Sequence, residues 1–526
     1  MGRKADSYAG GIKDGIFNLT DISAYFLHKS RAGESSLLSD QTCSDLGMEE
    51  LFTFADRTVS RVGQQYLYHT LRTISQAAGE IEQNEEIIGH LQTDSNLRNR
   101  LAKDLSRMQD TEAYSIVRLL SDEQPAIFQN RKIAFTILKF LPALFLLLYL
   151  FLHIPACGLL FLIAIIGNAG IHYTYKPKSL DYIYSVPQLI KLLGTAEKVC
   201  KYPELAQLGK EIPTALATLN PIRRTAFFLR MENKLQSDMA ALVWFCTELL
   251  HIFFLTEPLS FLQSVAILKN KNREIETVYR FVGLADCLLS VCFLREHLPY
   301  YCLPGKPGEG HRLVSESMYH PLIEDCVANS IDIQDKSVLL NGSNMSGKTT
   351  FIRIIGINVL AAQTLHTAFA RTFFLSASLN IHSALMLADD LSEGKSFYMK
   401  EVDTIKDMIS RSQEGITNLF LFDEIFKGTN TTERIAAAKA VLSYLNTRDN
   451  IIVASTHDTE LTTLLDKEYD LYHFSEVIEG ETFSFDYKLK SGPLYQRNAI
   501  RLLEINGFPS AVIRDAYRTI EGMTKQ

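Results

Sequence analysis

The stretch Ser337-Val-Leu-Leu-Asn-Gly-Ser-Asn-Met-Ser-Gly-Lys-Thr-Thr350 decides the fold class of this chain of 526 residues. Its apolar start, 337–340, predicts a β-strand, and the apolar residues from Thr350 to Leu365 predict a helix. Between them, residues 342–349 match the phosphate-loop pattern G-x-x-x-x-G-K-[ST] in the strand, loop and helix context that it requires. The stretch therefore predicts an α/β domain that begins after the turn-rich linker Pro304-Gly-Lys-Pro-Gly308.

This loop supplies the expected contacts to ATP and Mg²⁺. Glycines let backbone N–H groups turn inward around phosphate, and the N-terminus of the following helix adds positive potential. We expect Lys348 to bridge the outer phosphates and the Thr349 hydroxyl to bind Mg²⁺. The residues expected to bind the nucleotide are Gly342, Ser343, Asn344, Met345, Ser346, Gly347, Lys348, Thr349 and Thr350, with Gly394 of a later loop.

Two further predicted strands end in side chains suited to phosphate hydrolysis. Strand 418–422 leads into Asp423, expected to bind Mg²⁺, and Glu424, expected to orient or deprotonate the attacking water. Strand 451–454 leads to His457, which could hydrogen-bond the γ-phosphate or hold the water. Taken alone, such an acidic pair is usually just solvated, and such a histidine is more often a cap or a core hydrogen bond.

A short polar loop, Asp389-Asp-Leu-Ser-Glu-Gly-Lys-Ser396, lies between the phosphate loop and the acidic pair and has no evident structural task. In order along the chain, phosphate loop, Ser/Gly loop, acidic pair and histidine describe an ATP-binding cassette, in which the loop of a second subunit completes each site. We therefore expect a homodimer in which Gly394 and Ser396 of one subunit meet the γ-phosphate on the other. The residues expected to act in catalysis are Lys348, Ser396, Glu424 and His457.

This order of motifs resembles the MutS family. The similar segments are Tyr319-His-Pro-Leu-Ile323, the phosphate loop with Asn344-Met345, Asp389-Asp-Leu391 with Gly394-Lys-Ser396, Asp423-Glu-Ile425 with Gly428-Thr-Asn-Thr431, Ser455-Thr-His457, and Tyr487-Lys-Leu-Lys-Ser-Gly492. Upstream, residues 51–63 resemble the opening of the family's helical core, and residues 81–114 resemble its lever helices. The resemblance implies an ATPase dimer that closes on ATP and moves levers that contact mismatched or structured double-stranded DNA.

The chain departs from the family pattern in three places. Residues 1–50 leave no room for the mismatch-reading and connector domains that precede the helical core in the family. Glu393 stands where the family usually has a small polar residue, and an acid beside a γ-phosphate would repel it unless turned away. Ala384 lies near the place where an arginine is expected. We therefore expect slow turnover.

Residues 133–173 form an apolar segment whose only formal charge is Lys139. A spanning helix needs about 20 apolar residues, so the segment fits two spans with a break near His153-Ile154-Pro155. Basic flanks tend to stay in the cytoplasm, and here they are Arg131, Lys132, Lys176 and Lys178. The segment predicts a transmembrane hairpin. The hairpin would hold the protein at the cytoplasmic face of the inner or plasma membrane, with the ATPase domain in the cytoplasm.

Two alternatives to this hairpin remain open, a buried core hairpin and a single long pass. A core helix seldom stays apolar around its whole circumference for this length, and a single pass would put the flanking domains on opposite sides of the bilayer. A second apolar region, 239–268, contains Glu248, His251 and Glu257, and charge within a span is costly. We interpret it as a packed or membrane-surface helix, with a third span as the less favoured interpretation.

These patterns predict an α/β P-loop ATPase domain of the ABC type, preceded by an all-α core and lever region that carries the transmembrane hairpin. The expected parts are 1–130, the first part of the helical region; 131–176, the hairpin; 177–303, its second part; and 304–526, the ATPase domain of MutS type. The eight cysteines are scattered, with no CxxC pair and no clustered histidines of zinc-site spacing, which predicts reduced and mostly buried thiols.

The net charge of −7 gives no global attraction to nucleic acid, so DNA contact would need a local basic surface. Four basic residues of the lever segment could meet phosphates, although such charges more often form a solvated helix surface; they are Arg98, Arg100, Lys103 and Arg107. The competing hypothesis is a membrane-anchored mechanical or scaffold ATPase that no longer binds DNA. A transporter motor is less favoured, because two short spans per chain offer little pathway.

Overall fold

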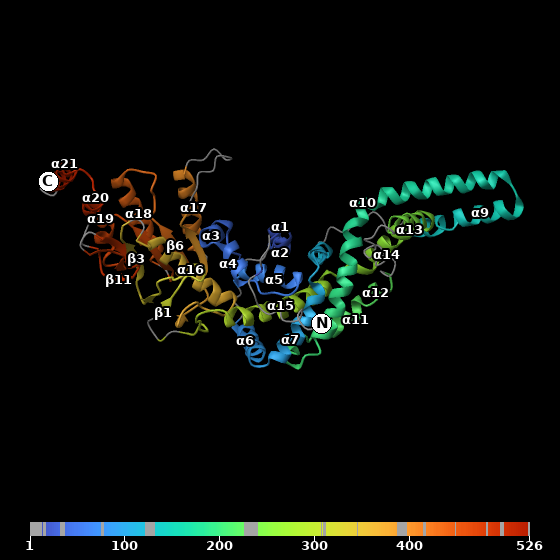
Figure 1. The fold of residues 1–526 in the computed structure, drawn as a ribbon, viewed down its shortest axis with the longest axis horizontal. Helices are drawn as coiled ribbons and strands as arrows, with labels where there is room; N and C mark the ends of the chain where they lie inside the picture. Colours follow the sequence, from blue (N-terminus) through green and yellow to red (C-terminus); the bar gives the residue numbers. More distant parts are fainter. Residues whose placement is uncertain are drawn as a thin grey trace. The chain divides into compact units, whose positions relative to one another are not determined.

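The computed structural model describes residues 13, 17–31, 37–74, 78–120, 132–225, 240–306, 308, 312–343, 346–386, 397–413, 417–447, 449–479, 482–494 and 499–523. The chain forms two compact units. A helical unit comprises residues 1–34, 56–69 and 82–294, and a sheet unit comprises residues 35–55, 70–81 and 295–526. Each is described by itself below (Figure 1).

The sheet unit is built on a six-stranded sheet of order β11-β8-β3-β7-β6-β5. Its strands are β3 (Ser337–Asn341), β5 (Asn380–Ala384), β6 (Asn418–Asp423), β7 (Ile451–Thr456), β8 (Tyr469–His473) and β11 (Lys490–Ser491). All neighbours pair in parallel except β11 and β8, which are antiparallel. The residues of β3 and β7 are all buried, as expected for parallel strands covered on both faces.

Helices cover this sheet and complete its core. They are α16 (Lys348–Thr364), α17 (Phe397–Arg411), α18 (Thr431–Leu445) and α19 (Thr459–Leu465). Two further helices, α20 (Ala499–Ile505) and α21 (Ser510–Met523), follow in the chain, and α21 is largely exposed. Phe420 and Phe422 of β6 pack with Leu442 and Leu445 of α18 in one buried cluster. The strands predicted at 337–340, 418–422 and 451–454 and the helix predicted after the phosphate loop are confirmed as β3, β6, β7 and α16.

A second, antiparallel sheet of order β2-β1-β4 belongs to the same unit. It consists of β1 (Leu313–Met318), β2 (Asn329–Ile333) and β4 (Thr372–Leu375), and a separate hairpin joins β9 (Glu476–Glu479) to β10 (Thr482–Phe485). The α/β character predicted for the C-terminal part of the chain is therefore confirmed.

Two N-terminal helices also belong to the sheet unit, α3 (Asp40–Leu46) and α4 (Met48–Ala55). The carboxylate of Asp45, which is fully buried, accepts hydrogen bonds from Ser383 Oγ at 2.6 Å and from the backbone N of Leu385 at 2.9 Å. Leu46 lies so close to Gly356 of α16 that a Cβ there would be 2.7 Å from its Cδ2. Part of the predicted helical region 1–130 thus packs on the ATP-binding cassette sheet instead.

The helical unit begins with α1 (Leu19–Ile22) and α2 (Ala24–Arg31). It continues through α5 (Arg61–Arg72), α6 (Ala78–Thr93), α7 (Ser95–Leu105), η2 (Ser106–Met108) and η3 (Thr111–Leu120). The last residues of α5 and the first residues of α6 belong to the sheet unit. After the apolar hairpin come η5 (Pro203–Leu205), α11 (Ile212–Leu219), α12 (Ile222–Thr225) and α15 (Asn272–Glu296). Helix α15 is apolar enough to cross a membrane, but 83% of its most apolar window is buried. We therefore assign α15 to the core of the unit.

The predicted hairpin consists of α8 (Lys132–Leu138), α9 (Leu141–Leu152) and the first half of α10 (Pro155–Val199). Figure 1 shows α9 running beside α10. The chain reverses at His153, which has a left-handed φ of 49°. Residues 133–152 and 155–176 are each long and apolar enough to span a bilayer, and only 11% of each window is buried. These windows are judged by composition and length alone, so the membrane anchor stays a prediction. Helix α10 continues past residue 176 without a break.

The second apolar region forms two helices, α13 (Ala240–Phe254) and α14 (Thr256–Leu268), bent by 67° at Leu255. Leu255 has a left-handed φ of 50°. Helix α14 is largely buried, whereas Phe245, Leu249 and Leu250 of α13 are exposed. Taken together as one bent span, the pair would be a further candidate for crossing the membrane.

Candidate nucleotide-binding and hydrolysis site

The phosphate loop connects β3 to α16, and its backbone requires glycine at two positions. Gly342 has a φ of 153°, and a Cβ there would lie 2.7 Å from the backbone O of Phe474. Gly347, the N-cap of α16, has a φ of 103°. Within the loop, Ser346 Oγ donates to the backbone O of Ser343 at 2.8 Å. The glycines therefore allow a tight turn that ends at a helix N-terminus, where an anion is stabilised.

Lys348 is the buried cation of this loop. Its side chain is 4% exposed, and Nζ donates to the backbone O of Gly342 at 2.7 Å and of Ser343 at 2.8 Å. Burial lowers the pKa of Lys348, and the carboxylates of Glu424 and Asp423 oppose that shift. An ammonium held against the loop by two carbonyls is placed where the loop would enclose a phosphate.

Asp423, at the end of β6, lies against two hydroxyl groups. Thr349 Oγ1 donates to Asp423 Oδ2 at 2.9 Å, and Ser455 Oγ donates a short hydrogen bond to Asp423 Oδ1. The second contact follows from the sheet register, which pairs Asp423 of β6 with Ser455 of β7. A hydroxyl and a carboxylate oxygen so close together suit Mg²⁺, which prefers oxygen ligands. Thr349 and Asp423 would hold that ion.

Glu424 and His457 meet beside this pair. Glu424 has a left-handed φ of 57°, which is uncommon for a residue with a side chain, and its backbone N donates to the backbone O of Ser455 at 3.2 Å. Its Oε2 lies 3.3 Å from His457 Nδ1 and 3.6 Å from Lys427 Nζ. The carboxylate is thus held between two groups that can carry positive charge, and His457 remains 46% exposed.

The sequence patterns did not indicate the two residues that form contacts next to His457. Nε2 of His457 lies 3.7 Å from Asp458 Oδ1, and Asp458 accepts two hydrogen bonds from Arg434 of α18, at 3.0 and 2.7 Å. These bonds raise the pKa of Arg434. Because Arg434 lies in a helix with no motif of its own, only the three-dimensional fold could connect it to the site.

Glu401 of α17 is a second functional candidate that the motifs did not indicate. It is 4% exposed and accepts a short hydrogen bond from the backbone N of Phe426, two residues after Glu424. Burial raises its pKa. On the same helix, Tyr398 lies so close to Gly428 that a Cβ there would be 2.9 Å from the Cβ of Tyr398. The start of α17 is therefore fixed to the loop that follows the acidic pair.

Tyr487 brings an aromatic ring to the phosphate loop. A Cβ at Gly347 would lie 3.2 Å from Tyr487 Cδ1, and Asn329 Nδ2 donates to the backbone O of Tyr487 at 2.9 Å. Tyr487 is 46% exposed, and the ring of Phe485 lies 5.8 Å from its own, centroid to centroid. An exposed ring beside a phosphate loop suits stacking on a nucleotide base.

The structure brings together most of the predicted site. Lys348, Thr349, Asp423, Glu424 and His457 lie in one connected set of contacts, and Thr350 follows in the first turn of α16. The remaining predicted contacts lie outside the described residues: Asn344 and Met345 of the phosphate loop, and Gly394 and Ser396 with Glu393 of the polar loop.

Fold and site together define a P-loop nucleoside-triphosphatase: a parallel sheet, a phosphate loop with a buried lysine, and an acidic pair at the end of a neighbouring strand. A family model, MutS domain V, matches residues 338–524. This segment of the chain is therefore a MutS domain V, the ABC-type ATPase domain of the MutS family.

Curated relatives named DNA mismatch repair protein MutS are similar to about half of the chain. The protein from Listeria welshimeri is 28% identical over 283 residues, 51% of this chain and 32% of the relative. Those from Thermotoga petrophila and Thermus aquaticus are 30% and 28% identical over 219 and 221 residues, 40% and 41% of this chain and 27% of each relative. The match thus spans about a third or less of the relatives' length.

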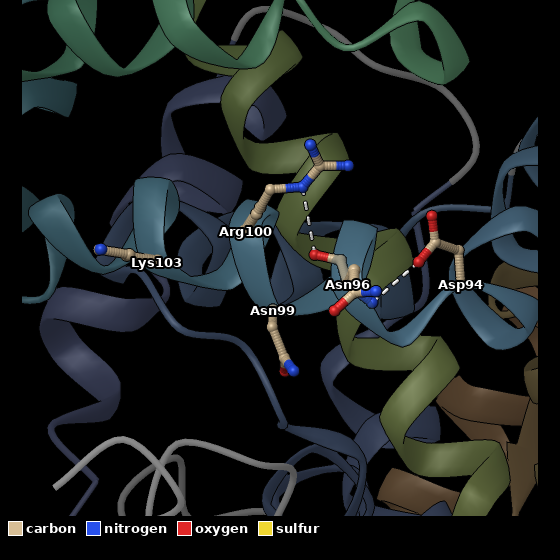
Figure 2. Close-up of a pocket in the computed structure, with 5 residues that line it drawn as sticks. All are labelled: Asp94, Asn96, Asn99, Arg100 and Lys103. Carbon is tan, nitrogen blue, oxygen red and sulfur yellow. Dashed lines mark hydrogen bonds between the residues drawn. The ribbon is translucent and has the colours of Figure 1, made fainter. Parts of the chain in front are cut away.

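The predicted DNA contacts fall on and near α7, beside a pocket of about 580 Å³ (Figure 2). Figure 2 shows the pocket's lining side chains, all from α7 and its N-cap: Asp94, Asn96, Asn99, Arg100 and Lys103. Of the four basic residues, Arg98 lies over the ring of Phe293, 5.5 Å from its centroid, and Arg107 lies 3.9 Å from Asp104. Arg100 and Lys103 are exposed and face the pocket.

Proposed function

We propose that this chain hydrolyses ATP with Mg²⁺ as a homodimer, in which Ser396 of the partner subunit completes each site. The observation that carries this proposal is the direct contact between Thr349 and Asp423, with Glu424 and His457 beside it. When bound, Mg²⁺ would neutralise charge on the outer phosphate oxygens. Lys348 then stabilises the charge that develops on the γ-phosphate, and Glu424 accepts the proton of the attacking water.

ATP would drive movement only through contacts that differ between an open and a closed dimer. The loop 387–396 supplies such a difference in the proposed dimer, because it contacts the γ-phosphate only when two subunits close. Glu401 and Tyr398, on the helix that follows this loop, are fixed to the segment after Glu424. Closure at the loop is therefore linked to the position of the acidic pair within one subunit.

Two substitutions test the shared site. Ser396→Ala should lower kcat with little change in ATP affinity, whereas Lys348→Ala should lower both, because only Lys348 belongs to the binding loop of the same subunit. The measurements are steady-state ATPase rates over a range of protein concentrations and equilibrium binding of a fluorescent ATP analogue. The shared site is wrong if Ser396→Ala hydrolyses ATP at the wild-type rate, or if a strictly monomeric sample has a specific rate that does not depend on concentration.

We also propose that residues 133–176 anchor the chain to the cytoplasmic face of the inner or plasma membrane. Supporting this proposal, the most exposed large apolar side chains include Ile133, Phe151 and Ile166, with 70–79% of their surface exposed. Such a surface is costly in water at about 25 cal/mol per Å² and favourable in lipid. Membrane fractionation tests the anchor, and recovery of the wild-type chain from the soluble fraction contradicts it.

DNA is the second candidate target of the ATP-driven movement, since the curated relatives are mismatch repair proteins and Arg100 and Lys103 are exposed on α7. Anisotropy of labelled homoduplex, mismatched and branched DNA should then show binding that weakens with salt. The double variant Arg100→Ala/Lys103→Ala should bind less than the control Lys201→Ala/Lys210→Ala, which removes two exposed lysines of the same unit. If no DNA binds even at low salt, the membrane-anchored scaffold ATPase without DNA binding is favoured.

A further inference from the structure

A polar stripe crosses the otherwise apolar start of α10. Asn168, His172 and Lys176 follow one another at intervals of four residues, which places them on one face of the helix. Asn168 and His172 are almost fully buried, at 1% and 0% exposed. Asn168 Nδ2 donates to the backbone O of Phe253 at the end of α13, at 3.1 Å. This polar face of α10 therefore packs against the bend between α13 and α14.

At this bend, one imidazole lies between two carboxylates. His172 Nε2 is 3.0 Å from Glu248 Oε1 of α13, and His172 Nδ1 is 3.5 Å from Glu257 Oε2 of α14. The side chains of the two glutamates are 8% and 3% exposed. The 67° bend at Leu255 brings the two glutamates, from successive helices, to the same histidine.

Two contacts describe the surroundings of this cluster. Lys176 Nζ lies 2.5 Å from Glu248 Oε1 and balances one carboxylate. Within the described residues, no group forms a hydrogen bond with Nδ1 of the buried His172, which faces Glu257. A buried ring nitrogen that no hydrogen bond satisfies is costly, and a cation bound between it and the carboxylates would satisfy it.

We propose that His172, Glu248 and Glu257 bind a divalent transition-metal cation of the Zn²⁺ or Mn²⁺ kind. One ligand atom from each residue lies within 4.8 Å of the other two, which is close enough for all three to bind one ion. An imidazole nitrogen with two carboxylates is a donor set for zinc, manganese and ferrous iron, whereas Ca²⁺ and Mg²⁺ prefer oxygen ligands throughout. The ion would join three helices, α10, α13 and α14, at the base of the apolar hairpin.

This site is separate from the nucleotide site and does not depend on the proposed function. All three ligands belong to the helical unit, whereas Thr349 and Asp423 belong to the sheet unit. The test uses the full chain in detergent, free of nucleotide and Mg²⁺. Zn²⁺ or Mn²⁺ is titrated in, and the bound metal is counted by mass spectrometry after gel filtration. In a background of Asp423→Asn, which weakens metal binding at the nucleotide site, one equivalent of Zn²⁺ or Mn²⁺ should remain.

Glu248→Gln and Glu257→Gln, which keep the shape of each side chain, should each lower the affinity for that equivalent at least tenfold. Glu211→Gln, an exposed substitution in the same unit, is the matched control and should bind as the wild type does. Zn²⁺ should raise the melting temperature of the control but not that of Glu257→Gln, because an ion bound only to the folded state stabilises it.

The proposal is overturned if both glutamine variants bind the metal as tightly as the wild type. It is also overturned if the Asp423→Asn protein retains no equivalent of Zn²⁺ or Mn²⁺. ATP hydrolysis, measured on the same wild-type preparation with Mg²⁺, reports on the nucleotide site separately.

Discussion

The two units of this protein distribute polar and apolar side chains in opposite ways. In the sheet unit, the strands β3 and β7 are wholly buried, and the charged groups of the site gather at the ends of the parallel strands. In the helical unit, large apolar side chains of the hairpin such as Phe151 and Ile166 are exposed, while the polar His172 of α10 and Glu257 of α14 are buried. The first arrangement is that of a protein surrounded by water, and the second is typical of helices surrounded by lipid.

Arginines on the hairpin should produce the largest effect. Leu144 and Ile166 are 48% and 70% exposed and lie near the middle of the two candidate spans. Each arginine at the centre of a span costs about 3 kcal/mol of insertion free energy, so Leu144→Arg/Ile166→Arg should cost about 6 kcal/mol. We expect the double variant to move from the carbonate-resistant membrane fraction to the soluble fraction, with its ATPase rate within about twofold of the wild type.

The matched control introduces two arginines at exposed apolar positions of the sheet unit, Leu464→Arg/Val512→Arg, where the side chains are 53% and 47% exposed. This control should remain in the membrane fraction. If the hairpin variant also stays there after carbonate extraction, the contrast between the two units does not reflect a bilayer.

Removal of the proposed base should give the next largest effect. Glu424→Gln keeps the size of the side chain but cannot accept a proton, so kcat should fall by about 10²- to 10³-fold, or about 3 to 4 kcal/mol. ATP binding should persist, because Lys348 and the phosphate loop are unchanged. Rapid-quench measurement of hydrolysis checks the rate, and Glu433→Gln, outside the site on α18, is the control. A Glu424→Gln protein with wild-type turnover would remove Glu424 from the mechanism.

Local sequence predicted the sheet unit well because its site is made of short motifs at strand ends. The strand, glycine turn and helix around Lys348 are adjacent in the chain, and parallel pairing then brings Asp423 and Ser455 together. The helical unit was predicted less completely. The apolar run 133–173 indicated two helices, but nothing in the run showed that His172 would meet two glutamates from later helices. That contact depends on the bend at Leu255, which has no turn motif.

The N-terminal residues show a second limit of prediction from local patterns. The sequence analysis placed residues 35–55 in the helical region 1–130, whereas they belong to the sheet unit. Their link to it is a buried carboxylate, Asp45, that accepts hydrogen bonds from Ser383, Leu385 and Met386. Contacts between segments so far apart in the chain leave no trace in hydrophobic periodicity.

Asp45→Asn should therefore destabilise the sheet unit. The amide that replaces one oxygen would face backbone N–H donors and could not accept from them, which should cost about 2 kcal/mol. The thermal transition of the sheet unit can be recognised because ATP stabilises the unit that binds it and so raises the midpoint of that transition. We expect this midpoint to be lower in Asp45→Asn than in the wild type. Asp40→Asn is the matched control, because the side chain of Asp40 is 96% exposed. Equal stability of the two variants would contradict the role assigned to Asp45.

A smaller effect should appear in the response of the sheet unit to acid. Burial, and then the nearby Arg353, lower the pKa of His320 to about 4, whereas an unfolded chain has a histidine pKa of about 6.5. Between these values the unfolded chain binds more protons, so the stabilising contribution is complete above pH 6.5 and is lost as the pH falls toward 4. Between pH 6.5 and 5.5, His320 should account for about 1 kcal/mol of lost stability. The free energy of unfolding of His320→Gln, measured with urea at both pH values, should fall less than that of the wild type by that amount. If the two proteins show the same pH dependence, His320 can be protonated in the folded protein.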